Sequence, residues 1–346
     1  MAKKHLFIIN PISFRKPGAV DSFIDYVRNV FETQIKMDYD IRISRFPRHA
    51  IRTVRRYITQ AGEDVTVRVY AVGGDGILFD CLNGLIGLPN AELASIPYGR
   101  SNDFIRSFGE GLFDLFRDIS SMALAPVVDT DVMHCGSMYS LLYCSIGTDG
   151  ETTKRILNFM ENVVKYWPAF LRKSRLVYNM VTSVCGLATL MFSRDLMKQK
   201  YVIDMDGRNF TGIYSNLNMA NSPCYGGDKN PVVTAMPNDG CIDALLFKGA
   251  GLLRCIANIG SYLDGEFDRD PECFILKRAK AITIHSDEPL MVGIDGEVFF
   301  ETAIDIEILP WMVKIVAPNS LTYKKKRDFY EVQKMANKLL AKKQRI

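Results

Sequence analysis

A glycine-rich loop with one carboxylate carries the clearest chemistry in this sequence of 346 residues. The motif Gly73-Gly74-Asp75-Gly76 follows the apolar run Val65–Val72 and precedes Ile77–Ile86, which has helical spacing. Glycines let the backbone approach a ligand closely, and the N–H groups at a helix start favour phosphate. Asp75 would repel phosphate unless a divalent cation lies between them, so the loop predicts metal-assisted phosphoryl transfer. The alternative is a tight turn in which Asp75 caps the helix.

Two other polar loops also follow apolar runs of strand type. The loop Asn10-Pro11-Ile12-Ser13-Phe14 comes after His5–Ile9, and Pro97-Tyr98-Gly99-Arg100-Ser101-Asn102-Asp103-Phe104 comes after Leu93–Ile96. The carboxyl ends of parallel strands open on one edge of a sheet, so these loops could hold one nucleotide together with the first motif. The first of them could equally be an ordinary Asn-Pro turn.

A pair of carboxylates lies near the other end of the chain, in Asp295-Gly296-Glu297. On an extended strand, residues i and i+2 point to the same side. One carboxylate could therefore accept a hydroxyl proton, while the other holds the first carboxylate in place or binds a metal. A hairpin turn between Met291-Val292 and Val298-Phe299 is the alternative interpretation.

The elements that would position these loops alternate regularly over the first part of the chain. Strand-like runs at His5–Ile9, Tyr39–Ser44, Val65–Val72 and Leu93–Ile96 are separated by stretches of helical spacing. This alternation predicts an α/β domain with a doubly wound parallel sheet over residues 1–125.

After residue 125 the pattern changes to successive strands, which predicts an antiparallel β-sandwich over residues 126–315. The expected strands are 127–132, 138–145, 200–206, 211–218, 241–247, 281–285 and 304–309. Residues 316–346 are expected to form a C-terminal basic helix that returns to the first domain.

The order of five motifs resembles the diacylglycerol kinase catalytic family, which includes sphingosine kinases and bacterial soluble lipid kinases. The motifs are the three loops above, Pro237-Asn238-Asp239-Gly240-Cys241-Ile242-Asp243, and Asp295-Gly296-Glu297. The resemblance covers about residues 4–310 and implies that the first domain binds ATP with Mg²⁺ while the β-rich second domain closes over it.

The resemblance also assigns roles to single residues. The implied nucleotide-binding residues are Asn10, Pro11, Ser13, Phe14, Ser44, Gly73, Gly74, Gly76, Ile77, Arg100, Ser101 and Asn102. Asp75 would organise Mg²⁺, Asp239 would lie near a structural metal site, and either Asp295 or Glu297 would act as the general base.

Three residues depart from the pattern of the family. Phe14 replaces a glycine, Ile77 replaces a common Thr, and Arg100 replaces a Thr or Ser. A guanidinium can bind phosphate through two hydrogen bonds where a hydroxyl offers one, so Arg100 is expected to pair with a phosphate or with Asp103.

The net charge of +4 is unevenly distributed along the chain. Residues 323–346 hold nine Lys/Arg and two acidic residues, a net charge of +7, which leaves −3 for residues 1–322. An acidic body argues against broad nucleic-acid binding. The basic tail could lie on an anionic membrane, or it could dock on the first domain with its charges in solvent.

Apolar stretches at 158–171 and 177–192 could line an acyl-chain groove, and could equally be core or a homodimer surface. Neither is long enough to span a bilayer. Eight cysteines without a C-x-x-C pair favour a reducing cytoplasm. The expected location is therefore cytoplasmic, at the inner membrane surface.

Together these features predict an ATP- and Mg²⁺-dependent kinase that phosphorylates the hydroxyl of a diacylglycerol-like lipid. Two alternatives stay open: a kinase of a soluble acceptor, as in NAD kinases, and a nucleotide-binding regulator without catalysis.

Overall fold

The computed structural model describes residues 2–14, 16–168, 171, 174–227, 229–249 and 252–344. The strands are β1 (Ala2–Ile9), β2 (Tyr39–Ile43), β3 (Val65–Gly73), β4 (Ala91–Pro97), β5 (Val127–Cys135), β6 (Met138–Ser140), β7 (Tyr143–Gly147), β8 (Lys200–Met205), β9 (Arg208–Asn209), β10 (Gly212–Ala220), β11 (Ile242–Lys248), β12 (Phe274–Ala279), β13 (Ala281–Ile294) and β14 (Glu297–Val316).

Helices of several lengths connect these strands. The α-helices are α1 (Ala19–Val30), α2 (His49–Ala61), α3 (Asp75–Leu85), α4 (Asp103–Arg106), α5 (Phe113–Arg117), α6 (Ile119–Leu124), α7 (Thr148–Asn162), α9 (Arg175–Phe192), α10 (Leu252–Leu263) and α11 (Phe329–Lys343). Shorter turns of helix are η1 (Pro11–Ser13), η2 (Phe31–Ile35), η3 (Val164–Tyr166), η4 (Leu196–Lys198), η5 (Phe267–Arg269) and η6 (Pro318–Ser320).

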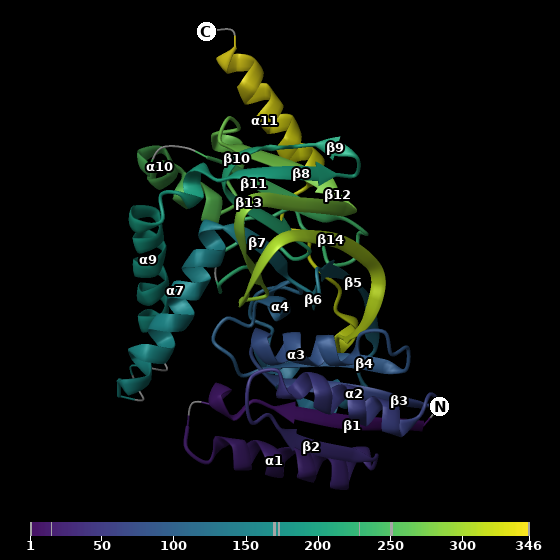
Figure 1. The fold of residues 1–346 in the computed structure, drawn as a ribbon. Helices are drawn as coiled ribbons and strands as arrows, with labels where there is room; N and C mark the ends of the chain where they lie inside the picture. Colours follow the sequence, from purple (N-terminus) through teal and green to yellow (C-terminus); the bar gives the residue numbers. More distant parts are fainter. Residues whose placement is uncertain are drawn as a thin grey trace.

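The first domain is built on parallel strands in the order β2-β1-β3-β4. Strand β1 buries the consecutive residues Leu6 to Ile9, as expected for a strand covered on both faces. Helix α2 buries Ala50, Val54 and Ile58, which recur every four residues and so form one apolar face. Figure 1 shows α1 on one side of the parallel strands and α2 and α3 on the other.

The second domain consists of antiparallel strands around its own core. Strand β8 alternates exposed and buried residues, and its buried Tyr201, Ile203 and Met205 belong to a core cluster with residues of β7, β10, β11, β13 and β14. Strand β10 pairs with both β7 and β8, and β13 pairs with the same two strands, so these four strands close around the core.

Strand β14 joins the two domains physically. Residues from Glu297 to Glu307 pair with β13, whereas Lys314 and Ile315 pair in parallel with β4 of the first domain. The strand bends between Leu309 and Val313, where the pairing with β5 shifts register and Trp311 has a φ of 55°. Figure 1 shows β14 curving from the second domain down to the first.

The basic tail takes a different place from the one that we expected. Helix α11 packs on η5 of the second domain, its Gln333 donates a hydrogen bond to the carbonyl of Leu276 at 2.7 Å, and Phe329 lies under the guanidinium of Arg278. Figure 1 places α11 at the end of the molecule opposite to α1. The helix therefore docks on the second domain, because its apolar residues find an apolar partner there.

Part of the positive charge of this tail is neutralised inside the molecule. Arg327 pairs with Asp268 at 3.1 Å, and Lys343 lies 3.6 Å from Asp270 and 3.7 Å from Glu272. The segment that does return to the first domain precedes α11, since Tyr323 is buried against Phe108 and bonds to Thr130 at 2.7 Å.

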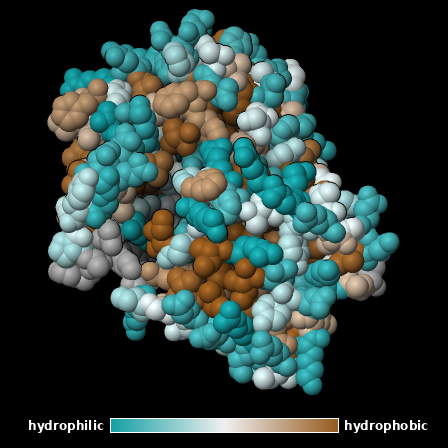
Figure 2. All heavy atoms as spheres, turned by 60° about the horizontal axis from the view of Figure 1, so that its bottom comes forward, coloured by the Kyte–Doolittle hydropathy of each residue, from teal (hydrophilic) through white to brown (hydrophobic). Residues whose placement is uncertain are grey.

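Helices α7 and α9 lie side by side along one flank of the molecule (Figure 1). Hydrophilic residues cover most of the face drawn in Figure 2, with hydrophobic residues gathered in patches between them. Within the described ranges, no helix has both the length and the apolar character that crossing a bilayer requires.

A buried arginine on β3 connects the parallel sheet to helix α6 within the first domain. The Nε of Arg68 donates to the Glu92 carboxylate at 2.6 Å, and its terminal nitrogens donate to the carbonyls of Met122, Ala123 and Ala125. Arg68 is 2% exposed, so protein groups and not water must compensate its charge.

Replacing Arg68 with Met is expected to lower the free energy of unfolding by about 3–5 kcal/mol, because Glu92 stays buried with Lys3 as its remaining cation. Denaturant titration measures this loss. The double variant Arg68→Met/Glu92→Leu should recover part of it. A double variant at least as unstable as the single one would contradict an electrostatic cause.

Candidate functional site

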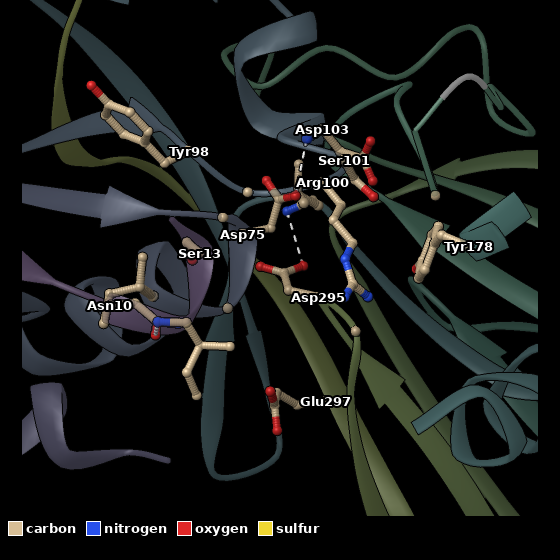
Figure 3. A pocket seen from close by; sticks show the side chains of 18 of the residues that line it. Asn10, Ser13, Asp75, Tyr98, Arg100, Ser101, Asp103, Tyr178, Asp295 and Glu297 are labelled. Atoms are coloured by element: carbon tan, nitrogen blue, oxygen red, sulfur yellow. Dashed lines mark hydrogen bonds between the residues drawn. The ribbon is translucent and has the colours of Figure 1, made fainter. Parts of the chain in front are cut away.

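A cavity of about 390 Å³ opens where the loops after β1, β3 and β4 meet the second domain. Its lining residues are Asn10, Ile12, Ser13, Gly74, Asp75, Gly76, Ile77, Tyr98, Gly99, Arg100, Ser101, Asp103, Leu142, Tyr143, Tyr178, Gly226, Asp295, Gly296 and Glu297. Ten of the predicted site residues are therefore together: Asn10, Ser13, Gly74, Asp75, Gly76, Ile77, Arg100, Ser101, Asp295 and Glu297. Figure 3 shows the side chains that surround the cavity.

Two glycines bring the loops after β3 and β4 into backbone contact. A Cβ added at Gly99 would lie 2.3 Å from the Cα of Gly74, and one added at Gly74 would lie 3.1 Å from the Cα of Gly99. The N–H groups of Tyr98 and Gly99 both donate to the carbonyl of Gly73, at 2.7 and 2.8 Å. Glycine is required here because no side chain fits between the two backbones.

Asn102 holds the second of these loops in shape and does not line the cavity. Its side chain accepts from the N–H of Gly99 and donates to the carbonyl of the same residue, both at 3.0 Å. Asn102 has a φ of 51°, a conformation that asparagine tolerates better than most residues. These bonds give Asn102 a role in shaping the loop, and the contact with a nucleotide that the resemblance implies stays a prediction.

The partly buried Asp75 and the buried Asp103 form a carboxylate pair at the cavity wall. The carboxylate of Asp75 accepts the N–H groups of Asp103 at 3.0 Å and Phe104 at 3.2 Å, while that of Asp103 accepts the N–H of Gly227 at 2.7 Å. Burial raises the pKa of Asp75; burial and the charge of Asp75 raise the pKa of Asp103 to about 8.

These two carboxylates fit a Mg²⁺ ion in the chemistry of their donors. Mg²⁺ is usually held by one or two carboxylates together with substrate phosphates, so a larger protein cage is not needed. A divalent cation would also relieve the repulsion that raises the pKa of Asp103. Among the described residues, the structure gathers no group of three or more His, Cys, Asp or Glu side chains suited to a metal.

Asp295 lies in a hairpin turn and still reaches the cavity. Asp295 and Gly296 have φ values of 48° and 89°, and Ile294 pairs with Glu297, which makes a two-residue turn between β13 and β14. The expectation that Asp295 and Glu297 point to the same side of an extended strand is wrong, because the turn rotates them apart (Figure 3).

Four donors surround the carboxylate of Asp295, which is 7% exposed. Its Oδ1 accepts from the Ser140 hydroxyl at 2.6 Å and from the N–H groups of Leu142 and Tyr143, whereas Oδ2 accepts one bond, from the N–H of Leu141 at 3.0 Å. Burial raises the pKa of Asp295 to about 6 despite these bonds, which lower it. Oδ2 keeps capacity to accept a further proton donor.

Glu297 lies at the other side of the hairpin in a more open environment. Its side chain is 40% exposed, its carboxylate is 3.9 Å from the guanidinium of Arg48, and it approaches Gly76 at the start of α3. Figure 3 shows it apart from Asp75, Asp103 and Asp295, which gather on one side of the cavity.

Arg100, the departure expected to matter most, extends along the cavity. Its guanidinium lies 5.6 Å from the centre of the Tyr178 ring, and one of its nitrogens is 3.9 Å from the sulfur of Met160. In Figure 3 the Arg100 side chain lies between Asp295 and Tyr178. The contacts with Tyr178 and Met160 tie the loop after β4 to helices α9 and α7.

Phe14 is absorbed into the core and does not line the cavity. It is 5% exposed and stacks on Tyr98 with ring centres 4.4 Å apart. The guanidinium of Arg117 lies 5.2 Å from the centre of the Tyr98 ring. A glycine at this position would leave that space empty. The substitution therefore changes the support of the loop more than its contact with a ligand.

Four other predicted residues also lie outside the cavity lining. Pro11 begins η1, which Asn10 caps through a hydrogen bond to the N–H of Ile12. Gly73 ends β3 behind the loop, and Ser44 donates to the carbonyl of Phe46 at 3.4 Å.

Asp239, the fourth, has a cation partner already. Arg278 lies 3.2 Å from Asp239 and 2.8 Å from Asp243, so a guanidinium offsets part of the charge of these carboxylates. The metal role that the resemblance implies for Asp239 stays a prediction. Burial raises the pKa of Asp239 to about 6, and Arg278 opposes that rise.

Sequence reasoning did not find several lining residues. Leu142 precedes β7 and Tyr143 begins it, and the N–H groups of both donate to the Asp295 carboxylate. Tyr178 comes from α9, more than seventy positions after the loop that it contacts. None belongs to a motif, and only the folded chain brings them to the cavity.

Comparison with known proteins gives two family matches that together cover most of the chain. The family described as "Diacylglycerol kinase catalytic domain" matches residues 4–135, and "YegS C-terminal NAD kinase beta sandwich-like domain" matches residues 174–317. The second match supports the coarser prediction of a β-sandwich-like second domain after a mixed α/β domain.

Individual relatives agree with these matches. The chain is 24% identical over 328 residues to "Putative lipid kinase YtlR" of Bacillus subtilis, covering 89% of this chain and 98% of the relative. It is 27% identical over 252 residues to a "Putative lipid kinase" of Staphylococcus haemolyticus, covering 72% and 75%. A solved structure titled as a "putative diacylglycerol kinase" from Bacillus anthracis shares the fold with a TM-score of 0.66 at 20% identity, covering 92% of this chain and 98% of that one.

Replacing Gly99 with Ala is expected to lower the free energy of unfolding by about 1–3 kcal/mol, because the new Cβ would overlap the Gly74 backbone. Denaturant titration of both forms measures the change. Gly260→Ala is the matched control, since it lies in helix α10 with no atom within 4 Å of the added Cβ. Equal stability of the Gly99 variant and the natural protein would disprove the close contact.

The raised pKa of Asp295 predicts a pH dependence of stability. A carboxyl that titrates at about 6 in the folded state and about 3.9 in the unfolded state stabilises the fold below pH ~4, and this contribution is lost as pH rises through about 6. The difference in unfolding free energy between the natural protein and Asp295→Asn should therefore fall across that range, by at most about 1.4 kcal/mol per pH unit. A difference that grows with pH would mean that the four hydrogen bonds outweigh burial.

Proposed function

Because this chain belongs to the diacylglycerol kinase catalytic-domain family, we propose that it is a lipid kinase that transfers the γ-phosphoryl group of ATP to the hydroxyl of a diacylglycerol-like lipid. The observation that carries the proposal is the convergence of Asp75, Asp103 and Asp295 on one cavity with the glycine loops after β3 and β4. Phosphoryl transfer depends mainly on positioning and charge neutralisation, and this cavity offers groups for both.

The glycine loops would hold the phosphates of ATP. The backbone at Gly76 is open to close approach at the start of α3, where N–H groups and the helix dipole favour negative charge. Arg100 adds a guanidinium at the same cavity, with donors suited to phosphate oxygens. Asp75 and Asp103 would hold Mg²⁺, which when bound neutralises charge on the phosphates.

Asp295 is the group best suited to accept the proton of the lipid hydroxyl. Its Oδ2 receives one hydrogen bond and lies at the cavity, and its pKa of about 6 leaves it ionised but basic near neutral pH. Glu297 is more exposed and lies beside Arg48. We therefore assign the base to Asp295 and a supporting role to Glu297.

The lipid acceptor is supported by the surface of helix α9. Tyr178 of this helix lines the cavity, while Met180, Leu187 and Met191 further along it are 53%, 51% and 45% exposed. These three side chains lie on the face of α9 opposite to Tyr178, so they suit contact with a lipid surface beside the cavity rather than its lining. The stretch 158–171 was expected to line an acyl-chain groove. Its Val164 is instead buried in a small core between α7 and α9, and its Phe170 lies outside the described residues. Contact with the inner membrane surface is part of the same proposal.

The proposal is tested with ATP labelled in its γ-phosphate, Mg²⁺, and mixed micelles that contain diacylglycerol, beside NAD as a soluble acceptor. Label should appear in the lipid, and Asp295→Asn should lower the rate by about 10²–10⁴-fold, as removal of a general base does. Asp64→Asn, an exposed turn residue between α2 and β3, is the control and should leave the rate unchanged.

The pH dependence of kcat/KM gives a second readout. The rate should rise with pH through about 6, because Asp295 must be deprotonated to accept the proton. Label in NAD and none in lipid would favour the soluble-acceptor alternative, and ATP binding without transfer to either would favour a regulator.

A further inference from the structure

A second cavity of about 390 Å³ lies on the outer face of the first domain, between helix α2 and the edge strand β2. Its lining residues are Arg42, Phe46, His49, Arg52, Thr53, Arg56, Tyr57 and Gln60. None of them lines the cavity that holds Asp75 and Asp295. Most of them recur on one face of α2 at spacings of three or four residues, so the sequence of that helix builds the cavity.

The segment that forms this cavity is strongly basic. Residues 41–62 contain six arginines and no Asp or Glu. Arg52 and Arg56 are exposed and four positions apart on α2, and neither forms an ion pair with any residue that the structure describes. Like charges at this spacing repel and weaken a helix. A bound anion would remove that repulsion.

An acidic residue that contacts two of the lining residues is already engaged. Asp40 on β2 pairs with Arg42 at 3.1 Å and bonds to the hydroxyl of Tyr57, whose pKa is raised by burial and by this bond. Asp38 adds negative charge near the same hydroxyl. The two carboxylates thus offset Arg42 and leave the charges of Arg52 and Arg56 uncompensated.

His49 adds an imidazole donor beside the arginines. Its Nδ1 accepts the backbone N–H of Arg45 at 3.3 Å, which places the ring proton on Nε2. Phe46, 61% exposed, lies against the His49 ring with centres 4.7 Å apart. The cavity therefore combines two uncompensated guanidinium groups, an imidazole N–H and an exposed aromatic ring.

We propose that this cavity binds a phosphate-bearing anion, at a site separate from the one proposed for ATP. Two guanidinium groups match the oxygens and the charge of a phosphate dianion better than those of a single carboxylate. The same chemistry is offered by a free phosphate compound and by the headgroup of an anionic phospholipid, which Phe46 could accompany into a lipid surface. The proposal does not rest on kinase activity.

The first arm of the test is calorimetric titration with pyrophosphate at low salt. The natural protein, the double variant Arg52→Gln/Arg56→Gln and the control Arg28→Gln/Arg208→Gln are compared. The control removes the same charge from arginines on α1 and β9, away from the cavity. All three proteins can bind pyrophosphate at the cavity that holds Asp75 and Asp295. A binding phase that is lost only in Arg52→Gln/Arg56→Gln therefore reports the cavity between α2 and β2.

We expect that phase to weaken at least about tenfold in Arg52→Gln/Arg56→Gln and to stay unchanged in the control. The second arm measures sedimentation with phosphatidylcholine vesicles with and without phosphatidic acid. Loss of binding to the phosphatidic acid vesicles in the same variant identifies a headgroup as the source, and loss in the pyrophosphate arm alone identifies a free phosphate compound.

Two results would overturn the proposal: binding that is equal in all three proteins in both arms, or an equal loss in the control, which would indicate a general effect of charge. Phosphorylation of lipid in detergent micelles should be the same in the Arg52→Gln/Arg56→Gln variant and the natural protein. The failure of this site and the failure of the proposed function are therefore distinguishable.

Discussion

The contact between the backbones of Gly74 and Gly99 is the constraint on which the rest of the cavity depends. It brings the loops after β3 and β4 close enough for the Asp75 carboxylate to accept the N–H groups of Asp103 and Phe104. Those bonds bury a second carboxylate beside the first, and the electrostatic character of the cavity follows from that pairing. The two glycines, Gly74 and Gly99, thus determine where the carboxylates of Asp75 and Asp103 lie.

The parallel strands and the glycine loops could be predicted from the sequence because both depend on local patterns. Buried runs such as Leu6 to Ile9 indicate a covered strand, and a glycine loop between a strand and a helix indicates close backbone approach. The family matches agree with the division into a mixed α/β part and a β-sandwich-like part.

The contacts that depend on partners distant in the chain could not be predicted in the same way. Nothing near Asp239 indicates that Arg278 pairs with it, and nothing near Phe14 indicates that Tyr98 and Phe23 receive its ring. The strand rule failed at Asp295 for a local reason, because two successive residues with positive φ replace the extended backbone that the rule requires. Helix α11 was misplaced since its apolar face is compatible with either domain until the surfaces are known.

Strand β14 has a consequence for how the molecule moves and unfolds. Since one continuous strand pairs with β13 in the second domain and with β4 in the first, the two halves cannot separate about a flexible hinge without breaking a sheet. We therefore expect the halves to unfold in a single cooperative transition. Access to the cavity must then come from smaller movements at its rim, and helix α9, which packs mainly on α7, is the element best placed to make them.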